Sequence, residues 1–205
     1  FDKEILIRAY EAYSDERINI HLGQALDIWW HKGKKNDIKE EEYLQMCANK
    51  TGCLSRLAAR LAVILAGGST KQEEKFGKFA ESLGIAFQIR DDILSATEAN
   101  FADKKGYGDD IKEGKRSLLV IHTIKHANEK DRKRLVEILD MHTGDKKLIN
   151  EAIDIIKKYK ATEYAHNLAK GLIESSWKEM ELFIKNSQVK ESLKALADFA
   201  IERRI

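Results

Sequence analysis

The chain has 205 residues, enough for one domain with a sizeable hydrophobic core. It contains no proline and few aromatic residues, a composition that favours long uninterrupted helices over a β-rich fold. Its 36 basic and 34 acidic residues nearly balance, which argues against a general nucleic-acid binder, so any anion site must come from local placement of charges.

The cysteines and the hydropathy pattern indicate an intracellular setting. Cys47 and Cys53 match neither a metal-site nor a redox spacing, so we expect a reduced, cytoplasmic protein. No apolar run approaches the length of a membrane span. Because the sequence starts at Phe1 and enters a helix pattern at once, we expect it to begin part-way through a larger fold.

The first long helix is predicted over residues 2–31, where apolar residues recur at helical spacing. Gln24 and Asp27 lie three residues apart in it and therefore share a face. The neighbouring Gly23 permits close approach of another backbone, since it has no side chain. Gly33 is expected to end this helix.

A second helix is predicted over residues 37–65, with an interruption at Lys50, Thr51 and Gly52. A threonine followed by a glycine inside a helix favours a bend or a loosened turn. Such a turn would free backbone groups to contact a ligand.

The central helix is predicted over residues 71–96. Gln88, Asp91, Asp92 and Ser95 stand at i, i+3, i+4 and i+7, so they form one polar stripe in an otherwise apolar pattern. An unpaired buried charge is costly, and a hard cation is the partner that best fits two adjacent carboxylates. The two aspartates lie about 100° apart around the axis, so we expect one to bind the metal directly and the other to act at its edge. For the pair alone, a solvated acidic face is the alternative.

After this helix, residues 100–114 are predicted to be an irregular loop whose glycines and lysines are able to wrap an anion; a solvated linker is the alternative. Further helices are predicted over residues 117–127, 129–141, 145–158, 161–186 and 188–202. No stretch of useful length alternates with the period of strands. The predicted fold class is an all-α bundle, with residues 1–205 as a single domain.

Together, the carboxylate pair, the interrupted helix and the lysine-rich loop provide ligands for a divalent metal and several lysines. A metal ion and lysines are the groups that hold a diphosphate. In order and spacing, these residues resemble the trans-isoprenyl diphosphate synthases, which make farnesyl, geranylgeranyl and longer polyprenyl diphosphates. The stretches that carry the resemblance are Gly23–Asp27, Lys50–Gly52, Phe87–Leu94, Lys105–Asp110 and Glu113–Ser117. The resemblance covers essentially the whole chain.

The resemblance implies an isoprenoid-synthase-type helical bundle that joins an allylic diphosphate head to tail to isopentenyl diphosphate. Asp91 and Asp92 look like the second aspartate-rich motif, which holds Mg²⁺ against the allylic diphosphate. Lys50 and Lys105 would contact that diphosphate as point charges, and Lys115 would belong to a closing loop.

Other roles follow from the same resemblance. Thr51 and Gln88 would present oxygens toward the carbocation, and Gln24 and Asp27 look like residues that line the substrate cavity. A homodimer is the expected assembly by analogy with the family.

Two departures from the family pattern matter. Ser95 stands where the family has a third aspartate, and the first aspartate-rich motif is not found in the sequence. We therefore expect a C-terminal portion of a synthase whose activity alone is incomplete. The alternative is a non-catalytic or regulatory homologue that keeps the fold and the dimer surface. A terpene cyclase is disfavoured, because its Asn/Ser/Glu metal motif is not found.

Overall fold

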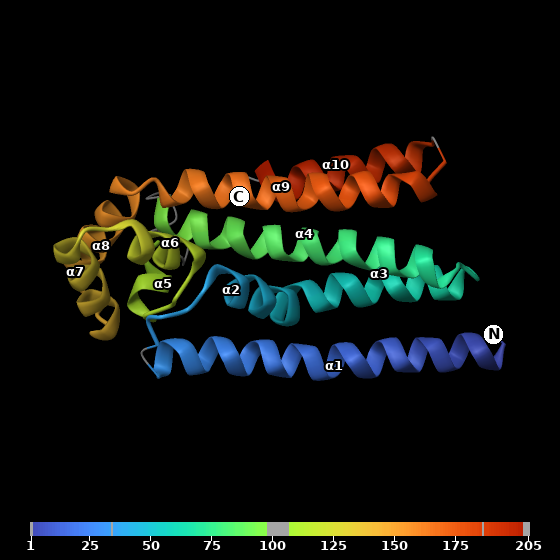
Figure 1. Ribbon diagram of the computed structural model, residues 1–205, viewed down its shortest axis with the longest axis horizontal. Coiled ribbons are helices and arrows are strands. Elements are labelled where there is room, and N and C mark those ends of the chain that lie inside the picture. Colours follow the sequence, from blue (N-terminus) through green and yellow to red (C-terminus); the bar gives the residue numbers. More distant parts are fainter. Residues whose placement is uncertain (1, 34, 98–106, 186, 203–205) are drawn as a thin grey trace. The chain divides into compact units, whose positions relative to one another are not determined.

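The computed structural model describes residues 2–33, 35–97, 107–185 and 187–202, and all regular structure in these ranges is helical. The three longest helices are α1 (Lys3–Lys32), α4 (Thr70–Thr97) and α9 (Ala161–Met180) (Figure 1). The other helical elements are α2 (Glu40–Cys47), η1 (Ala48–Gly52), α3 (Cys53–Leu65), α5 (Asp109–Lys112), α6 (Leu118–His126), α7 (Glu129–Asp140), α8 (Lys146–Lys158), η3 (Glu181–Phe183) and α10 (Gln188–Glu202). The predicted all-α fold class is confirmed. None of the helices in these ranges is both long and apolar enough to cross a membrane.

Two predicted breaks are confirmed. Helix α1 ends directly before Gly33, whose N–H donates to the carbonyl of Trp29 at 2.7 Å. The interruption predicted at Lys50–Gly52 is a π-helical segment, η1, between α2 and α3. A π-helix bonds each N–H to a carbonyl one residue further back than an α-helix does, so the turn is widened. Such widened turns are frequent at functional sites.

The stretch expected to be irregular over residues 100–114 contains a short helix, so that prediction was too simple. Helix α5 lies between Gly108 and Gly114, whose φ angles are 74° and 68°. Residues other than glycine adopt such positive φ angles only at a cost. The aspartates in the first turn of α5 interact favourably with the positive end of the helix dipole. Residues 98–106, with Lys105 among them, lie outside the described residues.

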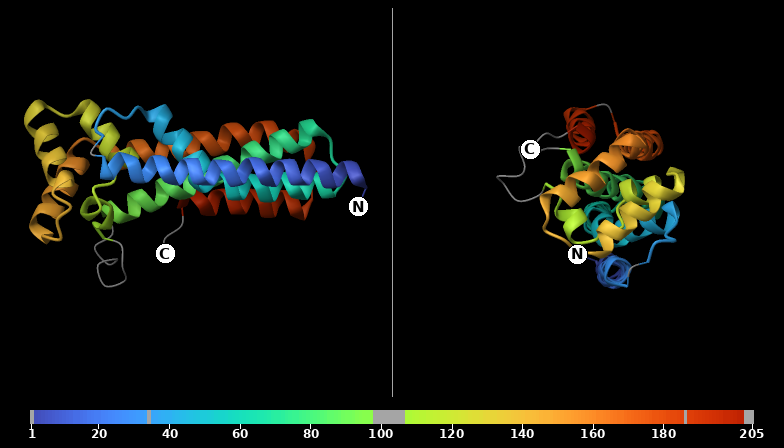
Figure 2. Two further views of the ribbon diagram at one scale, coloured as in Figure 1. Left: turned by 90° about the horizontal axis from the view of Figure 1, so that it is seen from below. Right: turned by 90° about the vertical axis from the view of Figure 1, so that its left-hand side faces the viewer.

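The chain divides into two compact units. Unit 1 comprises Phe1–Gln24, Gln45–Gln88 and Leu168–Ile205, and unit 2 comprises Ala25–Leu44 and Ile89–Asn167. In unit 1 the long helices run side by side (Figures 1 and 2). Phe79 of α4 packs edge-on against Trp177 of α9, with ring centroids 5.4 Å apart. Lys75 and Glu179 join the same two helices at 2.8 Å.

Buried charges connect α1, α3 and α4 within unit 1. The guanidinium of Arg56 donates to both carboxylate oxygens of Glu16, at 2.6 and 2.5 Å, and also to Glu81. Arg60 donates to Glu73 at 3.0 Å, and Arg8 donates to the same carboxylate at 2.8 Å. The three glutamates are buried, so these arginines supply the charge compensation that burial requires. We refer to these six residues as the arginine–glutamate network.

In unit 2, α5, α6, α7 and α8 pack around a small aliphatic core (Figure 1). Its fully buried residues include Leu118, Leu135, Ile138 and Ile153. Arg116 is also buried; it donates to the side chains of Asn36 and Asp140, at 2.9 and 2.5 Å, and to backbone carbonyls. Arg116 therefore ties the segment after α1 to the end of α7.

Candidate functional site

The residues selected from the sequence fall into two groups. Those in unit 1 are Gln24, Lys50, Thr51 and Gln88. Those in unit 2 are Asp27, Asp91, Asp92 and Lys115. Each group has its own geometry, and α4 carries members of both, since Gln88 is followed by Asp91 and Asp92 on the same helix.

In unit 1, α1 and η1 meet at backbone distance. A Cβ added to Gly23 would lie 2.4 Å from the backbone N of Lys50, and one added to Gly84 of α4 would lie 2.6 Å from Cα of Gly52. Such distances are far below van der Waals contact, so only glycine fits. The close approach expected at Gly23 is confirmed, and it fixes the π-helical segment that carries Lys50 and Thr51.

The structure brings Thr51 and Gln88 together. The Thr51 hydroxyl donates to Oε1 of Gln88 at 3.0 Å, joining η1 to α4 within unit 1. Thr51, Gln88 and Lys50 are all half-buried. The hydrogen bond fixes the orientation of both side chains, and the threonine oxygen keeps lone pairs able to face a positive charge.

In unit 2, the two aspartates of α4 differ in burial. Asp92 is 5% exposed, and its Oδ2 accepts a hydrogen bond from the hydroxyl of Tyr43 in α2 at 2.7 Å. Asp91 is half-buried. The two carboxylates therefore differ in burial, and a tyrosine hydroxyl holds Asp92.

Lys115 lies among carboxyl groups of the same unit. Its Nζ contacts Asp110 at 2.5 Å, and although burial alone would lower the pKa of Lys115, Asp110 first and then Asp92 and Glu113 raise it. Burial raises the pKa of Asp110 despite Lys115, and the negative charges of Glu113 and Asp27 add to the rise. We call Asp27, Asp92, Asp110, Glu113 and Lys115 the acid–lysine cluster.

The other selected residues are placed as follows. Gln24 is exposed and Asp27 half-buried on α1, three residues apart as expected. Ser95 accepts a long hydrogen bond, 3.5 Å, from the backbone N–H of Asp110, and its carbonyl accepts one from Gly108 at 2.9 Å. Ser95 therefore bonds to the start of α5 and to the residue before it.

Two residues of this arrangement were not selected from the sequence. Tyr43 reads as an ordinary core residue of an amphipathic helix, because nothing local shows that its hydroxyl meets a carboxylate 49 positions away. Asp110 had a local signal, a paired aspartate directly after a glycine and five residues before Lys115. The sequence did not show that Asp110 meets Lys115, because the stretch was expected to be an irregular loop.

The side chains available as ligands limit how a metal ion can be bound. Within the described ranges no three or more His, Cys, Asp and Glu side chains are grouped so that they could hold a metal ion. Mg²⁺ at phosphate sites commonly uses only one or two carboxylates, because water and substrate oxygens fill its other positions. The paired aspartates of α4 therefore fit Mg²⁺ bound jointly with a diphosphate, and they do not form a cage for the bare ion.

Comparison with known proteins shows which family the chain resembles. A family model described as polyprenyl synthetase matches residues 3–156. The short chain isoprenyl diphosphate synthase of Methanothermobacter thermautotrophicus is 37% identical over 202 residues, which cover 98% of this chain and 61% of that protein.

Solved structures give the same picture. The geranylgeranyl pyrophosphate synthetase from Pyrococcus horikoshii superposes with a TM-score of 0.88 at 31% identity, covering 100% of this chain and 61% of that one. A geranylgeranyl pyrophosphate synthase from Corynebacterium glutamicum, complexed with isoprenyl diphosphate and magnesium, gives a TM-score of 0.87 at 25% identity, covering 99% and 57%. The chain thus spans about three fifths of the length of the curated relatives it matches.

Proposed function

Because this chain belongs to the polyprenyl synthetase family, we propose that it takes part in prenyl transfer, the Mg²⁺-dependent head-to-tail condensation of an allylic diphosphate with isopentenyl diphosphate. The observation that carries the proposal is the composition of α4, where Gln88, bonded to Thr51, is followed within one turn by the carboxylates of Asp91 and Asp92. The family resemblance predicted from the sequence is confirmed; the activity is our proposal.

The reaction explains why these residue types are needed. Breaking the allylic C–O bond separates a diphosphate anion from a carbocation. Groups that bind the leaving group more strongly as its charge develops lower the barrier and do more than tighten binding. Bound Mg²⁺ would supply that stabilisation as a Lewis acid on the diphosphate oxygens. Asp91 would hold the ion, with Asp92 beside it.

The lysines and the polar oxygens have separate tasks in this proposal. Lys50, Lys105 and Lys115 would bind diphosphate oxygens as compact point charges. Thr51 and Gln88, fixed by their mutual hydrogen bond, would direct oxygen lone pairs at the carbocation. Oxygen dipoles that are oriented before the reaction stabilise a developing charge without reorganisation.

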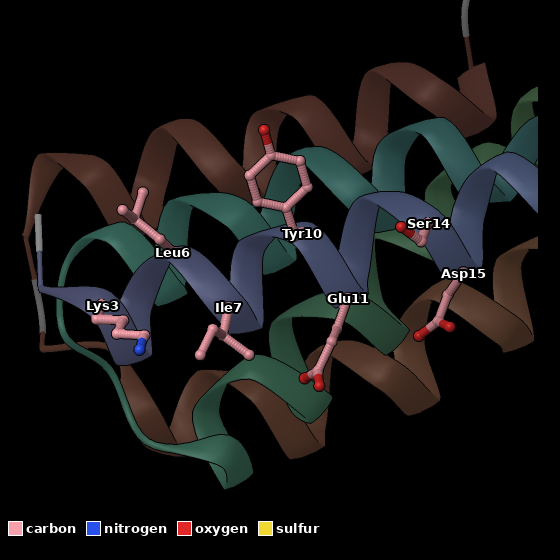
Figure 3. Close-up of a pocket in the computed structure, with 7 residues that line it drawn as sticks. All are labelled: Lys3, Leu6, Ile7, Tyr10, Glu11, Ser14 and Asp15. Atoms are coloured by element: carbon pink, nitrogen blue, oxygen red, sulfur yellow. The ribbon is translucent and has the colours of Figure 1, made fainter.

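The first helix supports the view that further protein surface takes part. Leu6, Ile7 and Tyr10 are 45%, 49% and 72% exposed on α1, and Figure 3 shows them on its surface beside charged side chains. An apolar stripe of this kind commonly marks an interface. We propose that full activity needs the portion of the relatives that this chain does not span, and that the protein acts as a homodimer.

We also propose a cytoplasmic location. Cys47 and Cys53 are both buried free thiols, which suits a reducing compartment.

Prenyl transfer by this chain can be tested with radiolabelled isopentenyl diphosphate, an allylic diphosphate and Mg²⁺. The chain alone should be slow, and mixing it with the portion of the Methanothermobacter relative that this chain does not span should restore turnover. Asp91→Asn should then lower the rate on the order of 10²–10³-fold, whereas Asp154→Asn, which changes an exposed carboxylate on α8, should not. Full turnover by the chain alone, or an unaffected Asp91→Asn variant, would contradict the proposal.

A non-catalytic homologue is the second candidate, and Ser95 is the observation that favours it. The serine would remove one negative charge from the family motif, and its hydroxyl instead accepts a long hydrogen bond from the backbone N–H of Asp110 in α5. A titration with a non-hydrolysable allylic diphosphate at increasing Mg²⁺ measures binding, and product formation separates the two candidates. A non-catalytic homologue would give no product in the mixture described above, even if it binds this ligand.

A further inference from the structure

Tyr43 and Asp92 form a buried hydrogen bond that the reaction scheme does not use. Tyr43 is 1% exposed, and its hydroxyl lies 2.7 Å from Oδ2 of Asp92, within the same unit. This distance is normal for a hydrogen bond from a hydroxyl to a carboxyl oxygen. A buried tyrosine hydroxyl usually finds such a partner.

The tyrosine is itself well anchored. It lies in the first turn of α2, where the side chain of Glu42 accepts from the N–H of Lys39 at 2.7 Å and caps the helix. The N–H of Tyr43 bonds to the carbonyl of Lys39 at 3.1 Å, so its backbone is part of that turn. With its ring buried and its backbone fixed, Tyr43 offers Asp92 a donor in one defined position.

We propose that Tyr43 is a positioning residue for the metal–diphosphate site, an inference that rests on the proposed function. By occupying Oδ2, Tyr43 fixes the rotamer of Asp92 and keeps this carboxylate buried. Asp92, thus oriented, would stand beside Asp91, about 100° around the helix, and act on the ion together with it. Partners that orient ligands from outside the coordination sphere typically change metal affinity 10–100-fold when removed.

A purely structural bond would have a different signature. It would stabilise the fold equally with and without ligand, whereas a positioning bond changes the dependence on Mg²⁺. Tyr159 provides a matched control, because its hydroxyl donates to Asp131 at 2.8 Å, also in unit 2. Tyr43→Phe and Tyr159→Phe thus remove the same bond type from two places.

The test uses the full chain and inorganic pyrophosphate as probe. The rise in the thermal unfolding midpoint is measured as MgCl₂ is titrated at saturating pyrophosphate. For Tyr43→Phe we expect the half-saturating Mg²⁺ concentration to increase about tenfold or more, and for Tyr159→Phe we expect no change. Asp92→Asn is then combined with Tyr43→Phe; since Tyr43 acts through Asp92, the second substitution should add nothing.

Several outcomes would overturn the inference. The inference is wrong if Tyr43→Phe has the half-saturation of the unsubstituted chain, if Tyr159→Phe shifts it equally, or if the two substitutions add fully in the double variant. If the unsubstituted chain shows no Mg²⁺-dependent stabilisation by pyrophosphate, the proposed function fails first and this inference falls with it. Measuring the unsubstituted chain alone distinguishes that case.

Discussion

The two units hold buried charge in different ways. In unit 1 each glutamate of the arginine–glutamate network has a basic partner, and the pairing between Arg56 and Glu16 is bidentate. In unit 2, Lys115 lies among the carboxyl groups of Asp92, Asp110 and Glu113. One region is a matched set of pairs, whereas the other gathers several carboxylates around a lysine.

The pKa values of the carboxyl groups move in opposite directions as a result. Burial alone would raise the pKa of Glu16, but hydrogen bonds from Arg56, Asn19 and Arg60 outweigh it and the pKa falls below 4.5. For Asp110 burial prevails over Lys115, and the pKa rises above 3.8. The arginines thus outweigh the burial of Glu16, whereas Lys115 does not outweigh the burial of Asp110. We infer that the first region stabilises the fold and the second serves binding.

The largest effect should follow from breaking the matched network. Arg56→Met leaves Glu16 with only a longer contact to Arg60, at 3.3 Å, and Glu81 with the exposed Lys78. Removing one partner of a buried ion pair costs about 3–5 kcal/mol. We therefore expect the free energy of unfolding, measured by urea denaturation, to fall by about that amount.

Arg134→Met is the control, since Arg134 pairs with Glu151 and Glu137 at the surface of unit 2. Solvent screens such pairs, so little change is expected. Equal losses of unfolding free energy in the two variants would show that the buried arginine–glutamate network contributes no more to stability than a surface ion pair does.

Removing the lysine of the acid–lysine cluster should mainly affect binding. Lys115→Gln takes away one charge-assisted hydrogen bond to a phosphate, worth about 1.5–3 kcal/mol, so Mg²⁺–pyrophosphate should bind about 10–100-fold more weakly. Lys112→Gln, three residues away and exposed, is the matched control and should bind normally. Isothermal titration calorimetry measures both. If Lys115→Gln lowers the free energy of unfolding as much as Arg56→Met does, while Mg²⁺–pyrophosphate binds as tightly as before, the contrast between the regions is wrong.

Much of the fold was predictable from local signals. Apolar periodicity gave α1, α4 and α6–α10 within a few residues, because long helices repeat one signal many times. Glycine and threonine at Thr51–Gly52 indicated the widened turn of η1. The short helix α5 was missed, since four residues carry too little periodicity to stand out from a glycine-rich loop.

The candidate site was predictable only in part, because helix spacing relates residues of one element. The spacing of Gln88, Asp91 and Asp92 needs no tertiary information. By contrast, the bonds from Thr51 to Gln88 and from Tyr43 to Asp92 join positions 37 and 49 residues apart. Only packing of different helices determines such pairs, and no pattern in one sequence encodes them locally.

The close fit of α1 on η1 gives a further test of unit 1, at the level of its backbone. Gly23→Ala places a Cβ 2.4 Å from the backbone N of Lys50, so α1 and η1 must separate; overpacking of this kind costs about 1–3 kcal/mol. Gly171→Ala in α9 is the control, because an added Cβ there meets nothing within 4 Å. Alanine is the better helix former, so this control should raise the unfolding midpoint. Equal changes in the two variants would contradict the close fit.

Acid should act on the two regions in opposite directions, and this is the smallest effect we expect. Because the folded-state pKa of Glu16 lies below 4.5, its contribution to stability is present above that pH and is lost as the pH falls through the folded-state pKa. The folded-state pKa of Asp110 lies above 3.8, so its contribution is present below that pH and is lost as the pH rises through the folded-state pKa.

Urea denaturation at a series of pH values measures these slopes. Glu16→Gln should flatten the decline in the free energy of unfolding below pH 4.5. Asp110→Asn should steepen the rise in the free energy of unfolding above pH 3.8, because the contribution of Asp110 falls as the pH rises and is then absent. Changes of slope in the same direction would mean that the two carboxyl groups are compensated alike. In that case the acid–lysine cluster would have no more reason to attract a cation than the arginine–glutamate network has.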